Sequence, residues 1–468
     1  MKSLVTALSF ILLSAAARAE TSKPNIIYIM ADDLGWAELG SFGQKKIKTP
    51  HLDQLAAEGM RFTQHYTGSP VCAPARCSLM TGKHGGHAFV RNNFEIGEWE
   101  SHEGQLPLKA DAVTIAEVLK ESGYATGAFG KWGLGGVDSE GDPMNQGFDR
   151  FYGYNCQRHA HNLFPEYLID DKERVTLPGN DGGVTGATYG PQKIADAVLD
   201  FVATNKDKPF FLYYPTVIPH LALQVPDTEL SPYLGEWTET PYTGKSYLPH
   251  PTPRAAYAAM ITFMDKQIGR LMKQLDDLGL SENTVIFFTS DNGTTFLKDQ
   301  VDFEFFESVG DLRGLKGEVY EGGIRVPLIV RWPGKIESGG VSELVSAHYD
   351  ALPTIAEIAG VKETPTTDGI SYLPTLLGQD QKAHDFLLWD FAGYGAQVAI
   401  RRGNWKAVIR DLKKNPDAEM ELYDLSKDRS ESKNLAAKNP ELVEELTKLI
   451  IESRDEPETE RFRFWRYE

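Results

Sequence analysis

Acidic side chains follow two short apolar runs in this chain, and together they could bind a metal ion. Asp32 and Asp33 follow the run NIIYIM after one alanine, and Asp291 and Asn292 follow the run TVIFFT after one serine. If both runs are strands at neighbouring places in one sheet, the four side chains meet at its edge. Their oxygen atoms suit a hard divalent cation such as Ca²⁺ or Mg²⁺. Either pair alone is more often a turn former or a helix cap than a metal site.

Two further apolar runs lead to side chains that could act on an anion. Lys131 lies just beyond the run ATGAF, and His220 follows the run FFLYY by way of Pro219. A lysine ammonium binds anionic oxygen, and an imidazole can hold or release a proton near neutral pH. A single lysine after a strand is usually a solvated surface residue. Whether Lys131 binds an anion therefore depends on which residues the neighbouring strands place beside it.

The elements that must position these residues alternate between strands and helices. We predict strands at 25–30, 125–129, 210–214, 284–289 and 326–332, and helices at 53–58, 112–122, 192–204, 254–278 and 349–359. Strands that are apolar almost throughout indicate a parallel sheet covered on both faces, and ligands bind such sheets beyond the carboxyl ends of the strands. The sequence therefore predicts an α/β fold with a large, mostly parallel central sheet flanked by helices.

The C-terminal part of the chain has a different pattern. Residues 397–409 read as a hairpin around Arg402-Gly403-Asn404, residues 420–425 as a further strand, and residues 441–453 as a surface helix. This pattern predicts a small antiparallel sheet with a helix, a C-terminal α+β subdomain at 383–468, after a linker near 379–384. The larger domain then spans residues 20–382.

Composition and charge exclude several classes of protein. Of 468 residues, 41% are apolar and 24% are charged, which is ordinary for a globular protein and excludes disordered and fibrous classes. The formal net charge is -18, so we expect no general binding of nucleic acid, which depends on clustered Lys and Arg. An anionic substrate would need a local group of cations that offsets this charge.

The N-terminus has the pattern of a targeting segment. Lys2 precedes an apolar run at 4–13, and small residues end at Ala17-Arg18-Ala19. This pattern predicts a signal peptide at 1–19, with a buried N-terminal helix as the alternative, and the run is too short to span a bilayer. We therefore expect an exported protein, periplasmic or secreted, without a membrane segment.

The chain has three cysteines, too few for a disulfide framework. A pair of Cys72 with Cys156, or of Cys77 with Cys156, is open on the sequence alone. An odd count leaves at least one cysteine for other chemistry.

The sequence around Cys72 resembles a known family. Cys72-Ala73-Pro74-Ala75-Arg76, followed by Thr81-Gly82, is similar to the signature of type I sulfatases, in which the cysteine is oxidised to Cα-formylglycine. Further segments resemble family motifs in the family's order, at 32–35, 130–132, 219–220, 290–293, 314–317, 321–327, 402–406 and 421–425. The resemblance spans about 24–435 and implies an alkaline-phosphatase-like fold and a sulfuric ester hydrolase.

The resemblance also implies how a sulfate ester would be cleaved. The hydrated aldehyde has two hydroxyls, one that attacks sulfur while the alcohol leaves, and one that then expels sulfate. The residues that the resemblance assigns are Asp32, Asp33, Cys72, Asp291 and Asn292 for Ca²⁺ (Mg²⁺ is the second choice), Arg76 to orient residue 72, Lys131 and Lys316 to hold sulfate oxygens, and His220 as the acid for the leaving alcohol. A formylglycine-generating maturation enzyme is the implied partner.

The chain departs from the family pattern at Gly133, where the family often has a histidine that assists the expulsion of sulfate. We hypothesise that His161 supplies the missing imidazole. The alternative is that His161 is satisfied by backbone groups or binds the substrate.

The substrate is indicated less directly. The segment 84–103, with Arg158 and His159, is predicted to line a subsite beyond the sulfate. Its candidate residues are His87, Arg91, Asn92, Asn93, Glu95, Trp99 and Glu100. Aromatic and polar residues suit a sugar ring, so we favour a sulfated carbohydrate over a small aryl sulfate. The competing functions are a phosphate or phosphonate ester hydrolase, and a glycan-binding protein without catalysis.

Overall fold

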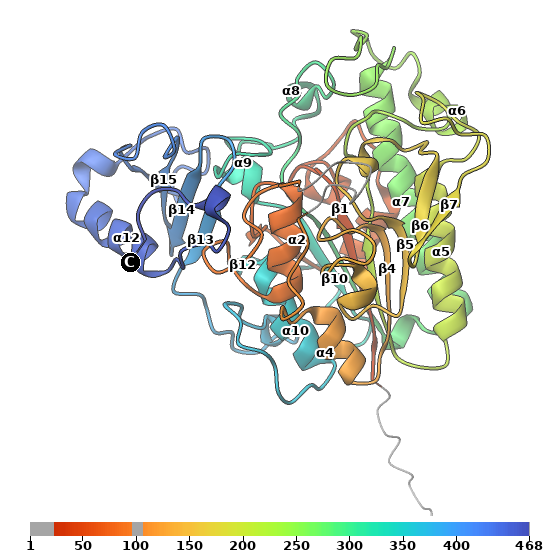
Figure 1. The fold of residues 1–468 in the computed structure, drawn as a ribbon, viewed down its shortest axis with the longest axis horizontal. Coiled ribbons are helices and arrows are strands. Elements are labelled where there is room, and N and C mark those ends of the chain that lie inside the picture. Colours follow the sequence, from red (N-terminus) through yellow and green to blue (C-terminus); the bar gives the residue numbers. More distant parts are fainter. Residues whose placement is uncertain (1–22, 96–105, 468) are drawn as a thin grey trace, which may run out of the picture.

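A ten-stranded sheet forms the centre of the protein (Figure 1) in the computed structural model, which describes residues 23–95 and 106–467. Its strands lie in the order β11-β2-β10-β9-β1-β8-β4-β5-β6-β7. They are β1 (Asn25–Ala31), β2 (Met60–Phe62), β4 (Ala125–Lys131), β5 (Arg150–Tyr154), β6 (Tyr167–Asp170), β7 (Glu173–Thr176), β8 (Phe210–Pro215), β9 (Thr284–Ser290), β10 (Leu328–Arg331) and β11 (Gly340–Ser342). A separate short pair joins β3 (His65–Tyr66) and β12 (Ser346–Ala347).

The predicted, mostly parallel sheet is confirmed at its centre. Strands β9, β1, β8, β4 and β5 are parallel neighbours. β10 runs antiparallel to both β9 and β2, and β6 and β7 are antiparallel additions at the other edge. An apolar run indicates that a strand is buried, but it carries no information about the direction of the strand. The sequence therefore predicted a strand at 326–332 without predicting that it pairs antiparallel with its neighbours.

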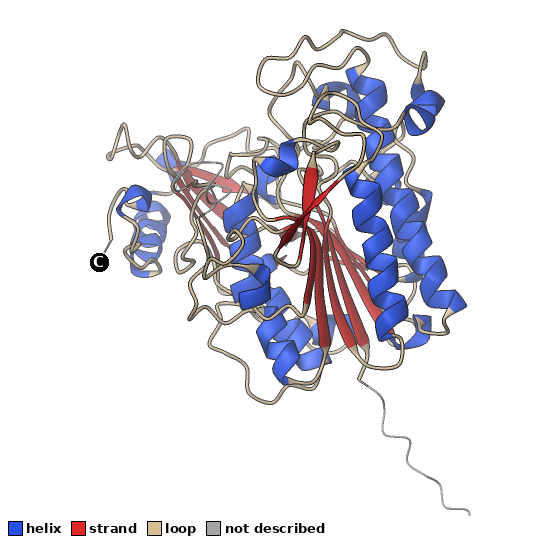
Figure 2. Cartoon of the chain, turned by 45° about the vertical axis from the view of Figure 1, so that its right-hand side comes forward, coloured by secondary structure: helices blue, strands red, loops and turns tan. Residues whose placement is uncertain are grey.

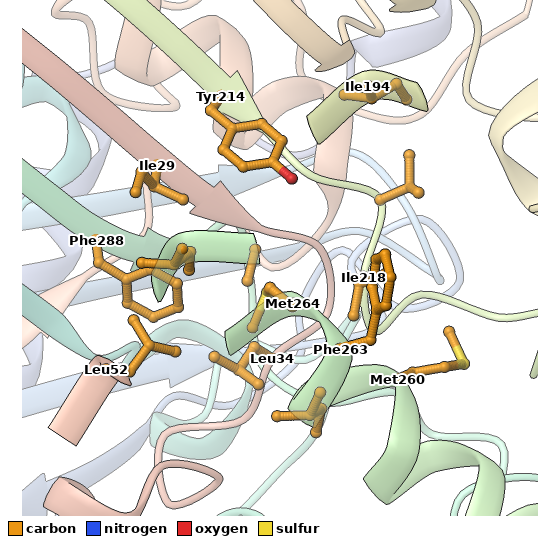
Figure 3. Packing of buried hydrophobic residues seen from close by; sticks show 14 of the residues in the cluster. Ile29, Leu34, Leu52, Ile194, Tyr214, Ile218, Met260, Phe263, Met264 and Phe288 are labelled. Atoms are coloured by element: carbon orange, nitrogen blue, oxygen red, sulfur yellow. The ribbon is translucent and has the colours of Figure 1, made fainter. Parts of the chain in front are cut away.

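Both faces of the sheet are covered by helices, as the apolar strands predicted (Figure 2). In β1, Ile27 and Ile29 join the core on one face, and Ile26 and Tyr28 join the core on the other. The first face packs against α1 (Pro50–Glu58), α5 (Gly190–Asn205) and α7 (Pro253–Asp277), and the second against α2 (Cys72–Thr81), α4 (Ile115–Glu121) and α10 (Ala351–Ile358). Figure 3 shows the first core, where Met264 of α7 lies close to Leu34.

The observed helices differ from the predicted ones by a few residues at their ends, where a capping interaction sets the boundary. α4 begins at Ile115 rather than at 112, because the Thr114 side chain accepts a hydrogen bond from the Glu117 N–H in a capping box. The remaining short helices are α6 (Asp227–Leu230), α8 (Phe303–Phe306), α9 (Glu321–Ile324) and α11 (Leu373–Leu376).

The C-terminal part folds as the predicted antiparallel sheet with a helix. The sheet contains β13 (Leu387–Phe391), β14 (Gln397–Arg402), β15 (Trp405–Ile409) and β16 (Glu421–Asp424), in that order, and α12 (Pro440–Glu452) packs against it. β13 was not predicted, because its run follows directly on the polar stretch that we read as a linker. Figure 1 shows this sheet beside the central domain.

A buried group of charges joins the C-terminal sheet to the central domain. Lys406 of β15 is completely buried, and its Nζ lies 2.9 Å from Glu321 at the start of α9 and 2.8 Å from Glu431. Burial raises the pKa of Glu321, but Lys406 and Arg325 outweigh it and hold that pKa at about 2. Burial raises the pKa of Glu431 to about 7 against the effect of Lys406. The segments 321–327 and 402–406, which are two of the family motifs in the sequence, therefore meet in one buried ion cluster.

Replacing Lys406 with methionine is expected to lower the free energy of unfolding by about 3–5 kcal/mol at pH 8, because Glu431 is left buried and charged. A carboxyl whose pKa is raised on folding adds stability below its unfolded value of about 4.5, and that stability is lost as the pH rises through about 7. The loss in the variant should therefore be smaller at pH 5.5. Denaturant unfolding at both pH values measures this.

Lys427→Met is the matched control, since Lys427 belongs to the same subdomain and its side chain is 81% exposed in an ion pair with Asp424. It should change stability by less than about 1 kcal/mol. Equal losses in the two variants would contradict the role of the buried cluster.

Neither of the alternative disulfides forms. Cys72, Cys77 and Cys156 are all buried in the described part of the chain, and each is a thiol. Within residues 23–95 and 106–467, no helix has both the length and the apolar character needed to cross a membrane. The predicted signal peptide lies outside the described residues.

Candidate active site

Four adjacent parallel strands bring the predicted site residues to one edge of the sheet. Asp32 and Asp33 follow β1, and Asp291 and Asn292 follow β9, its direct neighbour. On the other side of β1, the loop after β8 carries His220, and the next strand, β4, ends at Lys131. Because these strands are parallel, their carboxyl ends lie together, so the proposed metal ligands and two catalytic candidates meet in space.

Helix α2 places Cys72 against this edge. Cys72 is the first residue of the helix, and its Sγ lies 3.5 Å from Asp32 Oδ1 and 3.9 Å from Asp33 Oδ1. The Ala73 N–H donates to Asn93 Oδ1 at 2.8 Å, which fixes the start of the helix. The positive end of the helix dipole therefore points toward the place where an anion would bind.

Three cations balance the three carboxylates of the site. Lys131 Nζ lies 2.7 Å from Asp32, and Lys316 Nζ lies 2.7 Å from Asp33. Arg76 Nη2 lies 2.7 Å from Asp291 Oδ2 and 3.6 Å from Asp32 Oδ2. All six groups are buried. A protein with net charge -18 thus has, at this place, the local cations that binding of an anion requires.

The oxygen atoms of the site fit a divalent cation. Asn292 Nδ2 donates to Asp33 Oδ1 at 2.7 Å, while the buried Asn292 Oδ1 has no hydrogen-bond partner among the described residues. Donor atoms of Asp32, Asp33, Cys72 and His220 all lie within 4.8 Å of one another. This group of two carboxylates, a thiol and an imidazole could hold a metal ion, and the unsatisfied Asn292 Oδ1 adds an amide oxygen beside it.

The carboxylates differ in how the site affects their charge. Burial raises the pKa of Asp33 to about 6, since Lys316 offsets this effect only in part and Asp32 and Asp291 repel its charge. Burial and then Asp32 raise the pKa of Asp291. Burial would also raise that of Asp32, but Lys131 and Arg76 hold the pKa of Asp32 below its ordinary value. Crowded carboxylates of this kind gain from a bound cation.

Burial, and then the charge of Asp291, raises the pKa of the Cys72 thiol well above its ordinary value. The thiolate is therefore disfavoured at neutral pH. Cysteines that act directly as nucleophiles lie in surroundings that lower this pKa.

His220 lies beside the carboxylates and is neutral. Its Nε2 lies 3.6 Å from Asp33, and its Nδ1 lies 2.6 Å from the Leu221 carbonyl, to which it must donate. Burial, and then Lys316 and Lys131, lower the pKa of His220 well below its ordinary value. Nε2 is thus the nitrogen that faces the site and can accept a proton.

His161 stacks on His220. The ring centroids are 4.8 Å apart with an interplanar angle of 11°, and Tyr247 packs edge-on to both rings. The structure thus places His161 against His220, while its role as the missing imidazole stays a prediction. Tyr247 was missed, because it lies in a proline-rich loop with no periodic pattern or motif around it.

The space beside Gly133 is filled by Gln157. A Cβ atom placed on Gly133 would lie only 2.0 Å from Gln157 Nε2, and Gly133 has φ +76°. Gln157 is buried, and Arg76 Cδ lies 3.7 Å from the same Cβ position. The position where the sequence lacks a histidine side chain is therefore occupied by an amide from another loop, which the sequence did not reveal.

Gly133→Ala is expected to lower the free energy of unfolding by about 2–4 kcal/mol, from backbone strain together with the clash with Gln157. In a Gln157→Ala background, Gly133→Ala should lower the free energy of unfolding by only about 1 kcal/mol. Denaturant unfolding of the single and double variants measures this as a double-mutant cycle. Gly403→Ala is the control for strain alone, since Gly403 has φ +57° and open space around it. Additive effects at 133 and 157 would show that the amide does not fill this space.

The segment 84–103 has mixed roles. His87 Nδ1 lies 2.9 Å from Asp368, with His84 beside it, and buried Arg91 donates to the Gly86 carbonyl at 2.7 Å. These contacts hold the loop after α2. Asn93 caps α2 as described above, and Glu95 pairs with Arg158 at 2.5 Å. Asn92 Oδ1 lies close to Gly393. Trp99 and Glu100 lie outside the described residues.

His159 is buried between aromatic rings rather than turned to the site. Its ring centroid lies 4.3 Å from that of Tyr167 and 5.0 Å from that of Tyr154. This packing favours a structural role for His159 over the substrate contact that we predicted.

Comparisons with known proteins agree with this geometry. The family model named Sulfatase matches residues 24–361, and one named N-sulphoglucosamine sulphohydrolase, C-terminal, matches residues 315–456. The chain is 31% identical to an N-acetylgalactosamine-6-O-sulfatase of Bacteroides thetaiotaomicron, over 92% of this chain and 93% of that protein. It is 33% identical to human arylsulfatase A, over 95% and 90% respectively.

Solved structures share the fold. The structure of Ps i-CgsB in complex with k-i-k-neocarrahexaose has a TM-score of 0.77 and 27% identity, over 96% of this chain and 95% of that chain. A phosphonate monoester hydrolase of Agrobacterium radiobacter, with a TM-score of 0.65 and 20% identity over 91% and 94%, shares the fold alone. The match over most of the chain, together with the site at the strand ends, shows that this chain belongs to the sulfatase family of sulfuric ester hydrolases.

Proposed function

We propose that this protein hydrolyses a sulfate monoester of a carbohydrate by S–O cleavage, with residue 72 as the nucleophile after oxidation of Cys72 to Cα-formylglycine. One observation carries the proposal: Cys72 opens a helix against two carboxylates and inside a group of three cations. A carbohydrate is favoured over an aryl group because the N-acetylgalactosamine-6-O-sulfatase relative and the complex with neocarrahexaose both involve sugars.

The modification fits the surroundings of residue 72. The hydrated aldehyde of formylglycine would supply one hydroxyl that attacks sulfur and a second that later expels sulfate. A plain thiol is poorly suited to this place, since its pKa is raised among the carboxylates. A formylglycine-generating maturation enzyme is therefore the partner that this proposal requires.

Asp32, Asp33, Asp291 and Asn292, together with residue 72, would hold the divalent ion, for which Ca²⁺ is the first choice and Mg²⁺ the second. When bound, the ion would lower the pKa of the nucleophile and offset negative charge in the transition state. Asn292 Oδ1, which has no hydrogen-bond partner among the described residues, would gain one in that ion.

The cations of this chain would then bind and orient the sulfate. Lys131 and Lys316 approach the site from two sides of the carboxylates and would hold the sulfate oxygens. Arg76 donates to the Lys131 carbonyl and pairs with Asp291, so it fixes the positions of both. His220 Nε2 faces the site; it would first accept the proton that the attacking hydroxyl loses and then give that proton to the leaving alcohol, while His161 stacks on it and keeps its ring in place.

His220→Ala is expected to lower kcat for a sulfated sugar by about 10²–10³-fold, and His161→Ala by about tenfold. The loss in His220→Ala should be much smaller on 4-nitrophenyl sulfate, because nitrophenolate leaves without a proton. Steady-state kinetics on both substrates measure this. Equal losses on the two substrates would remove His220 as the acid, and an intact His161→Ala would remove His161 from the site chemistry.

Export is also part of the proposal. The pattern at 1–19 supports removal of a signal peptide and a periplasmic or secreted enzyme, in which residues 20–382 form the catalytic domain and 383–468 the C-terminal subdomain. N-terminal sequencing of protein exported by a host that processes this signal peptide tests whether cleavage follows Ala19.

The central test is the mass of the tryptic peptide 62–76 from protein made in a host that matures sulfatases. We expect a loss that matches exchange of CH2SH for CHO at Cys72. The same preparation should hydrolyse an aryl sulfate far faster than the matched aryl phosphate. An unmodified thiol in active protein would overturn the formylglycine proposal, and faster turnover of the phosphate would overturn the sulfate assignment.

A further inference from the structure

Two exposed aromatic side chains form a ledge at the rim of the site. Tyr394 is 59% exposed and Phe296 is 46% exposed, and their ring centroids lie 6.0 Å apart in an edge-to-face arrangement. The other large hydrophobic residues exposed in the described part of the chain are all aliphatic. We call Tyr394 and Phe296 the aromatic ledge. Tyr394 also packs edge-on against the buried Phe391, with ring centroids 5.7 Å apart, which anchors the base of its ring. Exposed aromatic side chains beside a site commonly mark a binding surface.

Tyr394 lies next to a residue of the site. Its ring packs over Gly317, where an added Cβ would come within 2.3 Å of Tyr394 Cε2, and Gly317 directly follows Lys316. The Gly317 N–H donates to the Pro70 carbonyl at 2.9 Å, close to Cys72 in the chain. The ledge therefore begins where the sulfate would be held.

The turn that carries Tyr394 is held in place from both sides. Gln397 Nε2 donates to the Gly317 carbonyl at 2.7 Å, and the Ala392 N–H donates to the Arg91 carbonyl at 3.2 Å. Tyr394 and Ala396 both have left-handed backbone, with φ of 44° and 64°. Non-glycine residues adopt this conformation at an energetic cost, and such strain is often retained where a side chain must point in a particular direction.

Phe296 is the second residue of the ledge. It lies in the loop after β9, and Lys298, two residues further on, lines a cavity of about 610 Å³ with Tyr242, Lys245 and Arg254. The Cα atoms of Phe296 and Lys298 are no more than about 7.6 Å apart, so one lining residue of the cavity lies near the ledge.

We propose that the aromatic ledge binds the apolar C–H face of a sugar ring next to the sulfated residue, so that the preferred substrate is an oligosaccharide rather than a sulfated monosaccharide. This inference rests on the proposed function. The C-terminal subdomain supplies Tyr394, and the central domain supplies Phe296 and the nucleophile. The length of the oligosaccharide is therefore recognised where the C-terminal subdomain contacts the central domain.

The test compares kcat/KM for sulfated monosaccharides with kcat/KM for tetrasaccharides that contain the same residue, across a panel of sulfated galactosamine, glucosamine and galactose. The ratio of tetrasaccharide to monosaccharide should exceed one in the wild type. It should fall about five- to tenfold in Tyr394→Ala and in Phe296→Ala, which is what one aromatic contact contributes. Tyr394→Phe should keep the ratio. Val341→Ala, at an exposed aliphatic residue of the edge strand β11, is the control.

A ratio is the chosen readout because a variant that only disturbs folding lowers both rates together. A length preference that survives both alanine variants would overturn the ledge while leaving the sulfatase proposal intact. Wild-type turnover of aryl sulfate without any preference for longer sugars would also overturn the ledge alone. Failure to hydrolyse any sulfate ester would instead overturn the proposed function.

Discussion

Replacing Cys72 with alanine is expected to lower kcat/KM for a sulfated sugar by at least about 10⁴-fold. Residue 72 is the first residue of α2, with its Sγ 3.5 Å from Asp32 Oδ1, and it lies among the three cations of the site. Alanine is a good helix former, so the variant should fold. Kinetics on the sulfated-sugar panel, together with the melting temperature of the variant, measure both effects.

Cys77→Ala is the matched control for this variant. Cys77 is buried in the same helix but belongs to the hydrophobic core on one face of the sheet. It should keep kcat/KM within about threefold while losing about 1 kcal/mol of stability, as expected for a small truncation in a core. If Cys77→Ala lost as much activity as Cys72→Ala, the loss would be explained by disturbance of helix α2 and not by removal of the nucleophile. If Cys72→Ala stayed active, the nucleophile would lie elsewhere.

Removal of divalent ions with a chelator is expected to lower activity by about 10²-fold or more, and added Ca²⁺ should restore it more fully than Mg²⁺. The physical reason is the crowding of Asp32, Asp33 and Asp291, which are buried together, and the Asn292 oxygen that lacks a partner among the described residues. A bound ion also stabilises the folded state, by about 2.7 kcal/mol when its concentration is 100 times its Kd.

Calcium binding is therefore measured in two ways, as recovered activity and as a rise in melting temperature. Asn292→Ala should reduce the rise, while Asp417→Asn should not, since the Asp417 side chain is 87% exposed and distant in the chain from the site. An enzyme that stays fully active without metal, and whose melting temperature does not respond to Ca²⁺, would show that the lysines and Arg76 alone balance these carboxylates.

The sequence determined the position of most of the site. Apolar runs predicted the strands now seen as β1, β4, β8 and β9, and they are buried because helices cover both faces of the sheet. Polar residues at the ends of parallel strands must meet at one edge, so local pattern alone brought Asp32, Asp291 and Lys131 together. The resemblance to sulfatases added the interpretation of Cys72, whose role no apolar pattern could indicate.

Only the tertiary structure decided how the site is completed. Lys316 reaches Asp33 from a loop fixed by Pro70 and Gln397, and Lys406 meets Glu321 across 85 residues of sequence. These contacts join segments that are far apart in the chain. A local pattern reports which residues are buried, but it carries no information about which distant segment faces them.

The same reason explains the residues that the sequence left open. His161 was one hypothesis for the imidazole missing at Gly133, and the structure stacks it on His220 while Gln157 fills the space beside Gly133. Tyr394 enters the rim from the turn between β13 and β14, although β13 itself was not predicted. The sequence determined the chemistry at the strand ends because it depends on local periodicity, whereas the tertiary structure decided the walls around it because they depend on long-range packing.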